Sequence, residues 1–474
     1  MRNSNMRKRI AAAAASAVMS VTAVTGTLGG TLLTNIGFVP SVSLAAESSV
    51  KVIASVGYGE GMYATWSSVS GATGYNVYVD GAQIDSMLIR QYSGYMRADA
   101  VGLKAGSHTM KIVPIVNGKE DSSKAAEATA TAYAHDRSGF AFVNGSSSGA
   151  YNDDGTLKSN AVVLYVTEST KNSVSMNVVT DSKGGTTSCT GVQPILSAYQ
   201  KGYESRPLCL RFIGNVTDPS TLEGGDILVK GNGSSKRLSC GVTIEGIGND
   251  AVFNGFGLRI ANASNVEVRN LGFMNCDSSE GDDIGLQQNN DHVWVHNCDL
   301  FYGDAGSDAD QVKGDGALDT KTSSYITHSY NHFWDNGKSN LQGMKSESTD
   351  NLITYHHNWY DHSDSRHPRI RTCTVHCYNN YFDGNAKYGV GATMGCSVFV
   401  ENNYFRNCPR PMMSSLQGTD AAGEGTFSGE TGGIIKSFGN YMEGVSSYIT
   451  YKDNSFSFDA YEASSRSETV PSSV

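Results

Sequence analysis

The chain has 474 residues and a formal net charge of −10, from 36 Lys and Arg against 46 Asp and Glu. This acidic balance argues against a nucleic-acid-binding protein, which normally carries a basic surplus. With 53 glycines and 9 prolines the chain is not Pro-rich and disordered, because average composition holds about 7% Gly and about 5% Pro. Abundant glycine with only 17% charged residues favours short strands joined by tight turns.

The first segment has the order of a secretory signal peptide. Four basic residues precede an apolar, Ala-rich run that begins at Ile10, and small residues follow up to Ala46. We therefore expect residues 1–46 to be removed and the protein to be secreted, without membrane association after cleavage. An uncleaved anchor is the alternative, because the uncharged stretch is long for a signal peptide. Removal takes away no acidic residue and changes the net charge to −14.

Residues 47–134 are predicted to form a small β-sandwich. Alternating apolar and polar residues, as in 75–79 and 110–115, are separated by Asp80-Gly81 and Asn117-Gly118, which are hairpin-turn pairs. The segment from Trp66 to Tyr75 resembles a fibronectin type III module. We expect Trp66 and Tyr75 to be core aromatic residues rather than a sugar-binding platform.

From residue 135 to 462 the sequence contains a repeat of short β-rich runs, each followed by an asparagine. Repeats of 22 to 37 residues that cannot bury their own apolar face predict a solenoid, and the period-two pattern excludes helical repeats. A right-handed parallel β-helix fits best, with asparagine amides hydrogen-bonding from coil to coil. A short amphipathic helix over 192–201 would cap its open end, and residues 463–474 form a tail. The repeated asparagines are Asn270, Asn297, Asn331, Asn358, Asn380, Asn403 and Asn440.

Carboxylates cluster at two points of this repeat. Glu280 and Asp282 precede one strand, and Asp315 and Asp319 are spaced by four, which places both on one side of an extended strand. Several carboxylates without Cys or His ligands suit a hard cation, most plausibly calcium. Solvated turn residues are the alternative interpretation.

Basic residues follow about one coil further along the chain. Lys338 comes first, and the segment Arg366-His367-Pro368-Arg369-Ile370-Arg371 comes next. Two arginines five residues apart, with a proline between them, are typical of an anion clamp. Stacked coils would bring these groups together in one groove.

With these residues the region from about 190 to 410 resembles the pectate lyases of polysaccharide lyase family 1. The resemblance is carried by 265–271, by Val293-Trp294-Val295, by 315–319, by the Arg-x-Pro-x-x-Arg element of 366–371 and by 376–380. It implies a secreted enzyme that cleaves polygalacturonate, the de-esterified form of pectin, by β-elimination to 4,5-unsaturated oligogalacturonides. We expect it to act as a monomer.

The same resemblance implies a role for each site residue. Asp282, Asp315 and Asp319 would bind calcium, with Glu280 as a less secure ligand. Lys338 and Arg371 would bind substrate carboxylate, and Arg366 would be the general base.

Arginine is an unusual base because a free guanidinium keeps its proton to a pKa above about 12. Neighbouring positive charges favour loss of that proton, which predicts activity under alkaline conditions. Local sequence alone allows Arg366 to be part of an anion clamp instead. Three other functions stay open: a pectin lyase, a β-helical polygalacturonase that uses paired carboxylates, and a non-catalytic polysaccharide-binding surface protein.

Overall fold

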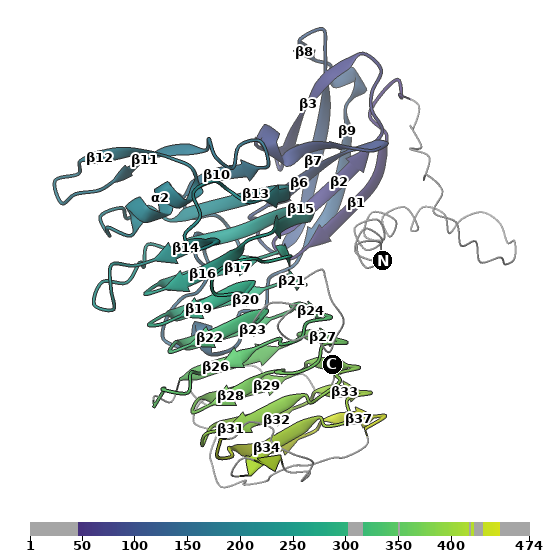
Figure 1. Ribbon diagram of the computed structural model, residues 1–474. Coiled ribbons are helices and arrows are strands. Elements are labelled where there is room, and N and C mark those ends of the chain that lie inside the picture. Colours follow the sequence, from purple (N-terminus) through teal and green to yellow (C-terminus); the bar gives the residue numbers. More distant parts are fainter. Residues whose placement is uncertain (1–45, 302–315, 349–350, 417–418, 421–429, 446–474) are drawn as a thin grey trace, which may run out of the picture. The chain divides into compact units, whose positions relative to one another are not determined.

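The protein is described by a computed structural model, which covers residues 46–301, 316–348, 351–416, 419–420 and 430–445 (Figure 1). The predicted signal peptide therefore lies outside the described residues except for Ala46, and so does the predicted tail. The described chain is almost entirely β-structure, and the predicted class, a parallel β-helix preceded by a small β-sandwich, is confirmed.

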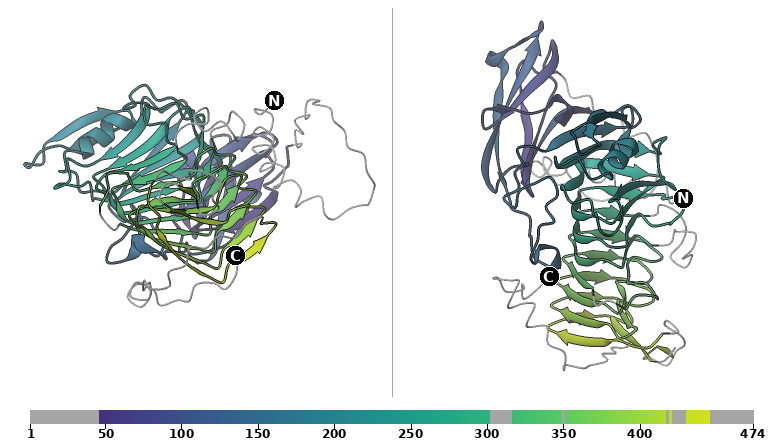
Figure 2. Two further views of the ribbon diagram at one scale, coloured as in Figure 1. Left: turned by 60° about the horizontal axis from the view of Figure 1, so that its bottom comes forward. Right: turned by 90° about the vertical axis from the view of Figure 1, so that its left-hand side faces the viewer.

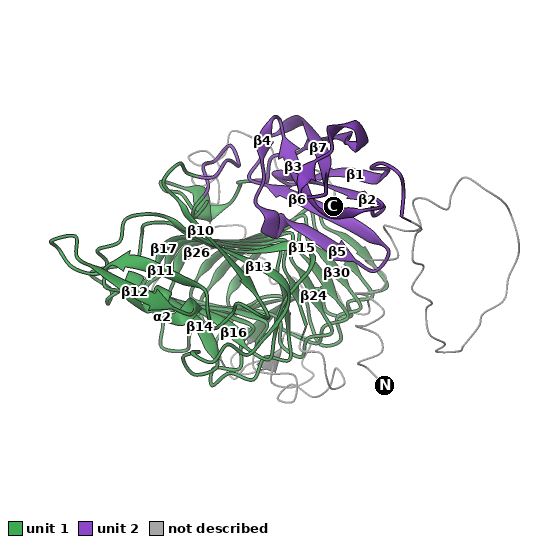
Figure 3. Ribbon diagram, turned by 90° about the horizontal axis from the view of Figure 1, so that it is seen from above, with its two compact units in different colours: residues 1–3, 137–150, 158–474 green, residues 4–136, 151–157 purple. Residues whose placement is uncertain are grey.

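The contacts divide the chain into two compact units (Figure 3). Of the described residues, those of 137–150 and 158–445 form one unit, and those of 46–136 and 151–157 form the other. The boundaries read from the sequence, after residues 46, 134 and 462, stay predictions. No helix in the described part of the chain has the length and apolar character needed to cross a membrane.

The smaller unit is a sandwich of two antiparallel sheets around one apolar core. Trp66 is fully buried in this core and packs edge to face on Tyr75, with ring centroids 5.2 Å apart, which confirms their expected role. The first sheet contains β1 (Val52–Tyr58), β2 (Gly61–Trp66), β6 (Tyr95–Val101) and β5 (Ile89–Tyr92). The second contains β4 (Ala82–Gln83), β3 (Ala72–Val79), β7 (Gly106–Val116), β8 (Lys119–Glu120) and β9 (Ala126–Ala132). Two 3-10 turns complete the unit, η1 (Ser86–Leu88) and η2 (Ser122–Lys124).

The larger unit is a solenoid whose strands stack in parallel from coil to coil (Figures 1 and 2). Its nine-stranded sheet contains β14 (Asp226–Lys230), β16 (Gly257–Ala261), β19 (Ile284–Gln287), β22 (Leu318–Lys321), β25 (Leu341–Gln342), β28 (Arg369–Arg371), β31 (Val390–Thr393), β34 (Met412–Leu416) and the antiparallel β35 (Thr419–Asp420).

A second, seventeen-stranded sheet provides the other two faces of the solenoid. It begins with β10 (Val162–Thr167), β13 (Leu208–Thr217) and β15 (Val242–Asn254). One column then contains β17 (Ser264–Arg269), β20 (Asp291–His296), β23 (Ser324–Ser329), β26 (Leu352–His356), β29 (Thr374–Tyr378), β32 (Ser397–Glu401) and β36 (Ile434–Phe438). The other contains β18 (Gly272–Met274), β21 (Asp299–Leu300), β24 (His332–Trp334), β27 (Trp359–Asp361), β30 (Tyr381–Asp383), β33 (Tyr404–Arg406) and β37 (Tyr441–Glu443).

Strand register explains why these coils stay stacked. Each coil places a β-branched residue at the same inward position, so that a continuous apolar column fills the interior. None of the nine cysteines forms a disulfide among the described residues. The column contains Val266, Val293, Ile326, Ile353, Val375, Val398 and Ile435.

The asparagine ladder is present, with one correction to the predicted series. It runs from Asn331 to Asn440, each side-chain amide bonding the next at 2.9 to 3.1 Å. Asn270 and Asn297 lie one residue earlier in the turn, where φ is positive (53° for both). Asparagine tolerates that left-handed conformation, so the same residue type is used in two adjacent turn positions.

The predicted capping helix is α2 (Val192–Tyr199). It packs on β14 and on the hairpin of β11 (Ser175–Val179) and β12 (Thr186–Thr190), and its apolar side chains are buried in the solenoid core. A 3-10 turn, η3 (Phe140–Phe142), packs on the face of the column that contains β23.

Candidate functional site

Four of the predicted site residues, Asp282, Asp319, Lys338 and Arg366, lie where successive coils enter the nine-stranded sheet. Backbone hydrogen bonds join this point of each coil to the next, so residues far apart in sequence form one column along the solenoid. Neighbouring parallel strands lie about 4.8 Å apart. The bonds run from Asp283 N to Gly316 O (3.1 Å), from Ala317 N to Lys338 O (3.0 Å) and from Asn340 N to Arg366 O (2.7 Å).

Two carboxylates of this column, Asp282 and Asp319, converge on one cation. Both residues are buried, with 2% and 0% of their surface exposed. The Nζ of Lys321 lies 3.4 Å from Oδ2 of Asp282 and 3.9 Å from Oδ2 of Asp319. Burial acts to lower the pKa of Lys321, but the carboxylates of Asp319, Asp282 and Glu280 outweigh it and raise the pKa.

Glycine residues lie against both carboxylates. A Cβ at Gly316 would meet Oδ1 of Asp319 at 2.3 Å, and a Cβ at Gly285 would meet Oδ2 of Asp282 at 3.4 Å. Asp283, next in the chain, is fully buried with no hydrogen bond to either carboxylate oxygen, and burial raises its pKa far above the usual value. Buried oxygen donors with glycine beside them fit a calcium ion.

The other two predicted calcium ligands are placed differently. Glu280 accepts hydrogen bonds from Arg259 Nη1 (3.3 Å) and Gln287 Nε2 (2.7 Å), so its carboxylate is already engaged outside the pair. Asp315 lies outside the described residues.

Lys338 and Arg366 follow on the next two coils. Lys338 is buried, with 6% of its surface exposed, and its strand position pairs with Ser365. Arg366 is partly exposed and has φ of 64°, a left-handed conformation that is unusual for a bulky residue and often occurs at functional sites. Its side chain makes no hydrogen bond or ion pair with the residues that the structure describes.

The neighbouring histidine is not suited to act as a base. His367 is fully buried, and its Nδ1 lies 2.6 Å from the carbonyl oxygen of Tyr388. Burial lowers the pKa of His367 to about 3. The ring is therefore neutral at physiological pH but a weak proton acceptor, and its role is structural.

Arg371 is engaged by a carboxylate that the sequence did not predict. Its Nε and Nη2 lie 3.0 Å and 2.9 Å from Oε1 of Glu430. Arg369 reaches Oε2 of the same carboxylate with Nη2 at 2.9 Å, and Nη1 of Arg371 donates to Gly343 O at 3.3 Å.

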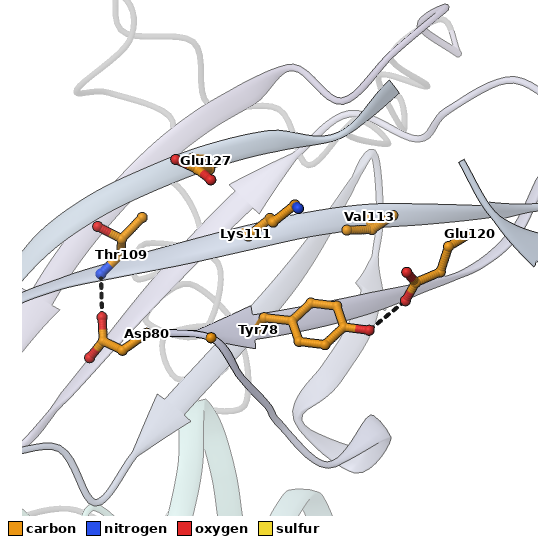
Figure 4. A pocket seen from close by; sticks show the side chains of 8 residues that line it. Tyr78, Asp80, Thr109, Lys111, Val113, Glu120 and Glu127 are labelled. Carbon is orange, nitrogen blue, oxygen red and sulfur yellow. Dashed lines mark hydrogen bonds between the residues drawn. The ribbon is translucent and has the colours of Figure 1, made fainter. Parts of the chain in front are cut away.

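A separate pocket of about 310 Å³ lies on the sandwich sheet formed by β3, β7 and β9. Figure 4 shows Tyr78 donating to Glu120 (2.6 Å) and the backbone of Thr109 donating to Asp80 (3.0 Å). Together with Glu127, three carboxylates here surround one lysine, Lys111. Such a lining disfavours anionic ligands.

Comparisons with known proteins agree with the geometry of the solenoid. A family model described as pectate lyase matches residues 227–458. A pectate trisaccharide-lyase of Bacillus licheniformis is 32% identical over 238 residues, which cover 50% of this chain and 67% of that protein. The chain belongs to the pectate lyase family, a family of enzymes.

Two further pectate lyases extend this comparison. A probable pectate lyase A of Aspergillus fumigatus is 34% identical over 206 residues, which cover 41% of this chain and 62% of the relative. A pectate lyase of Bacillus sp. N165, solved in complex with trigalacturonate, superposes with a TM-score of 0.53 at 25% identity. That match covers 68% of this chain and 91% of the solved chain.

Two residues of this candidate site were missed by the sequence analysis. Lys321 lies two residues after Asp319 on β22, a spacing that places both side chains on one face of the strand. That signal was available in the sequence. Glu430 lies 59 residues after Arg371, and no spacing rule connects the two.

Proposed function

We propose that the solenoid is a calcium-dependent pectate lyase that cleaves de-esterified polygalacturonate by β-elimination. The observation that carries this proposal is the order of groups along one sheet. The buried carboxylates of Asp282 and Asp319 come first, and Lys338 and Arg366 follow on the next coils. A polysaccharide chain that follows this column would meet an oxygen-lined cation site and then basic groups.

Asp282 and Asp319 are the proposed calcium ligands, with Asp315 as the third by resemblance and Glu280 as an outer carboxylate. Bound calcium would supply positive charge that neutralises a uronate carboxylate and stabilises the charge developing next to it. Lys338 and Arg371 are proposed to bind substrate carboxylates, and Lys321 provides a further cation between the acidic pair.

Arg366 is the proposed base. In β-elimination the C5 proton passes to a nitrogen of neutral Arg366, the C4–O glycosidic bond breaks, and its electrons leave with the oxygen. The C5–H electron pair forms the C4=C5 double bond of the unsaturated product. Because a general base must lose its own proton before it can accept one, we expect activity to rise with pH in the alkaline range.

An absorbance assay tests the reaction class. Purified protein is incubated with polygalacturonate, and ultraviolet absorbance of the unsaturated product is followed with calcium and then with a chelator. We expect a calcium-dependent rise. New reducing ends without absorbance would indicate a hydrolase, and activity that persists in chelator would contradict the calcium assignment.

The variant Arg366→Lys tests the base. Because lysine keeps a positive charge without the guanidine nitrogens, kcat should fall at least about 100-fold. Arg237→Lys is the matched control, since Arg237 pairs with Asp291 on another face of the solenoid. Normal turnover by Arg366→Lys would remove Arg366 as the base.

Two further assignments belong to this proposal. The basic and apolar order of residues 1–46 supports export, which mass determination of the secreted protein would test. The two-sheet sandwich with Trp66 and Tyr75 in its core supports a fibronectin type III-like accessory module. We propose that the protein acts as a monomer, which light scattering would check.

A further inference from the structure

Two arginines of the proposed substrate groove share a single carboxylate. Arg369 and Arg371 are two residues apart on β28, so their side chains lie on the same face of the strand. Both contact Glu430, and the three side chains are only 15%, 13% and 8% exposed. Two guanidinium groups at this spacing repel each other, and a carboxylate between them relieves that repulsion.

The backbone of Glu430 and of the two residues after it is hydrogen-bonded to the solenoid. Ser415 Oγ donates to the carbonyl oxygen of Glu430 at 2.5 Å, and Met394 N donates to Thr431 O at 2.6 Å. Gly432 also pairs with Thr393 at the end of β31. The carboxylate therefore belongs to the sheet that holds the site.

The geometry of the contact leaves part of Arg371 available. A guanidinium has five N–H donors. Glu430 takes the side formed by Nε and Nη2, and Gly343 takes one N–H of Nη1. Within the described part of the chain, one N–H on Nη1 and one on Nη2 make no hydrogen bond, and these terminal nitrogens can bind a second carboxylate end-on.

The charges of Glu430 and the two arginines allow Arg371 to bind Glu430 on one side and a second carboxylate on the other. Burial acts to raise the pKa of Glu430, but bonds from Arg371 and Arg369 outweigh it and lower the pKa. The carboxylate is thus ionised across the neutral and alkaline range. Two guanidinium groups and one carboxylate carry a net charge of +1, which still attracts an anion.

We propose that Glu430 is a positioning residue for substrate binding, which holds Arg371 side-on so that its two terminal N–H groups receive a uronate carboxylate. This inference rests on the proposed pectate lyase function. It differs from a blocking role, in which Glu430 would occupy the substrate's place and have to be displaced.

Steady-state kinetics on polygalacturonate with the full chain separate these roles. Glu430→Gln should raise KM roughly tenfold, because a charge-assisted bidentate pair is lost, while kcat changes much less. Glu430→Asp should recover part of the loss. Asp383→Asn is the matched control, because it removes the carboxylate from the Arg406 pair on β30 and β33 and should leave KM unchanged.

A double-mutant cycle tests whether Glu430 acts through Arg371. In an Arg371→Ala background, Glu430→Gln should have no further effect on KM. An equal rise of KM in both backgrounds would overturn the inference, as would a lower KM for Glu430→Gln, which is the signature of a blocking residue. An inactive wild-type protein would instead reject the proposed function, so the two failures are distinguishable.

Discussion

At the scale of single residues, Lys321 affects both calcium binding and substrate binding in the proposed function. Its ammonium group lies against Asp282 and Asp319, the carboxylates proposed to bind calcium. A resident ammonium group and a metal ion compete for the same carboxylates. If the carboxylates bind calcium as proposed, Lys321 weakens that binding while it contributes positive charge to the groove.

This competition predicts that removing the charge of Lys321 strengthens calcium binding but weakens substrate binding. Lys321→Met should raise calcium affinity roughly threefold or more, because a positive charge next to the ligands is removed. The same substitution should raise KM for polygalacturonate. Titration calorimetry with calcium measures the first effect, and kinetics at saturating calcium measure the second.

Lys387→Met is a suitable control, since Lys387 is 46% exposed and lies 4.0 Å from a different carboxylate, that of Asp364. Weaker calcium binding by Lys321→Met would contradict this view of the site, because it would mean that Lys321 supports the ligands instead of competing for them.

Residue chemistry also explains which site groups could be predicted from sequence. Asp282, Asp319, Lys338 and Arg366 could be predicted because clustered carboxylates and the basic residues that follow them stand out in the repeat, and because a family resemblance assigns them roles. Glu430 could not be found in this way, because it lies 59 residues after Arg371 and no spacing rule connects the two.

At the scale of elements, the asparagine ladder holds the turns of the solenoid in register. Asn380 Nδ2 donates to Tyr355 O (2.9 Å) and to Asn403 Oδ1 (3.0 Å), and its Oδ1 accepts from both nitrogens of Asn358. The side chain thus satisfies buried polar groups on the two neighbouring coils.

Removing a central member of the ladder should therefore be costly. Asn380→Ala should lower the free energy of unfolding by about 2 kcal/mol or more, because it leaves buried backbone groups without partners. Asn440→Ala should cost about half as much, since within the described residues Asn440 bonds one neighbouring asparagine and is partly exposed. Urea unfolding followed by circular dichroism gives both free energies of unfolding. Equal losses of stability in the two variants would show that burial of the asparagine does not decide how much it contributes.

The presence of the helix and of the asparagine ladder could be predicted from the sequence more reliably than the exact residues that form them. The helix expected over 192–201 is present over Val192–Tyr199, because an amphipathic pattern after a strand is a strong local signal. The ladder was predicted one residue early at Asn270 and Asn297. A left-handed turn position and a buried amide position both favour asparagine, and sequence alone does not separate them.

At the scale of the whole molecule, the sandwich and the solenoid have separate apolar cores. A chain with two cores need not unfold as one cooperative unit. We expect two calorimetric transitions, with calcium raising only the one that belongs to the solenoid. The stabilisation should approach about 2.7 kcal/mol when free calcium is 100 times its dissociation constant.

Differential scanning calorimetry with calcium and with chelator checks this expectation. The variant Asp319→Asn is the matched control, since its solenoid transition should no longer respond to the metal. If calcium raised the temperature of both transitions, or still raised that of the solenoid in Asp319→Asn, the placement of the metal in the solenoid would be contradicted.

The hydrogen-bonded column at the entry to the nine-stranded sheet also affects how such a protein can change over time. The height of each site residue along the solenoid is fixed by the number of coils between them, not by the number of residues in the connecting loops. Loops can therefore lengthen, shorten or acquire new contacts while the distances between the functional groups stay constant. Substrate preference can then diverge through loop insertions, and redesign of this enzyme should begin with the loops and leave the strands intact.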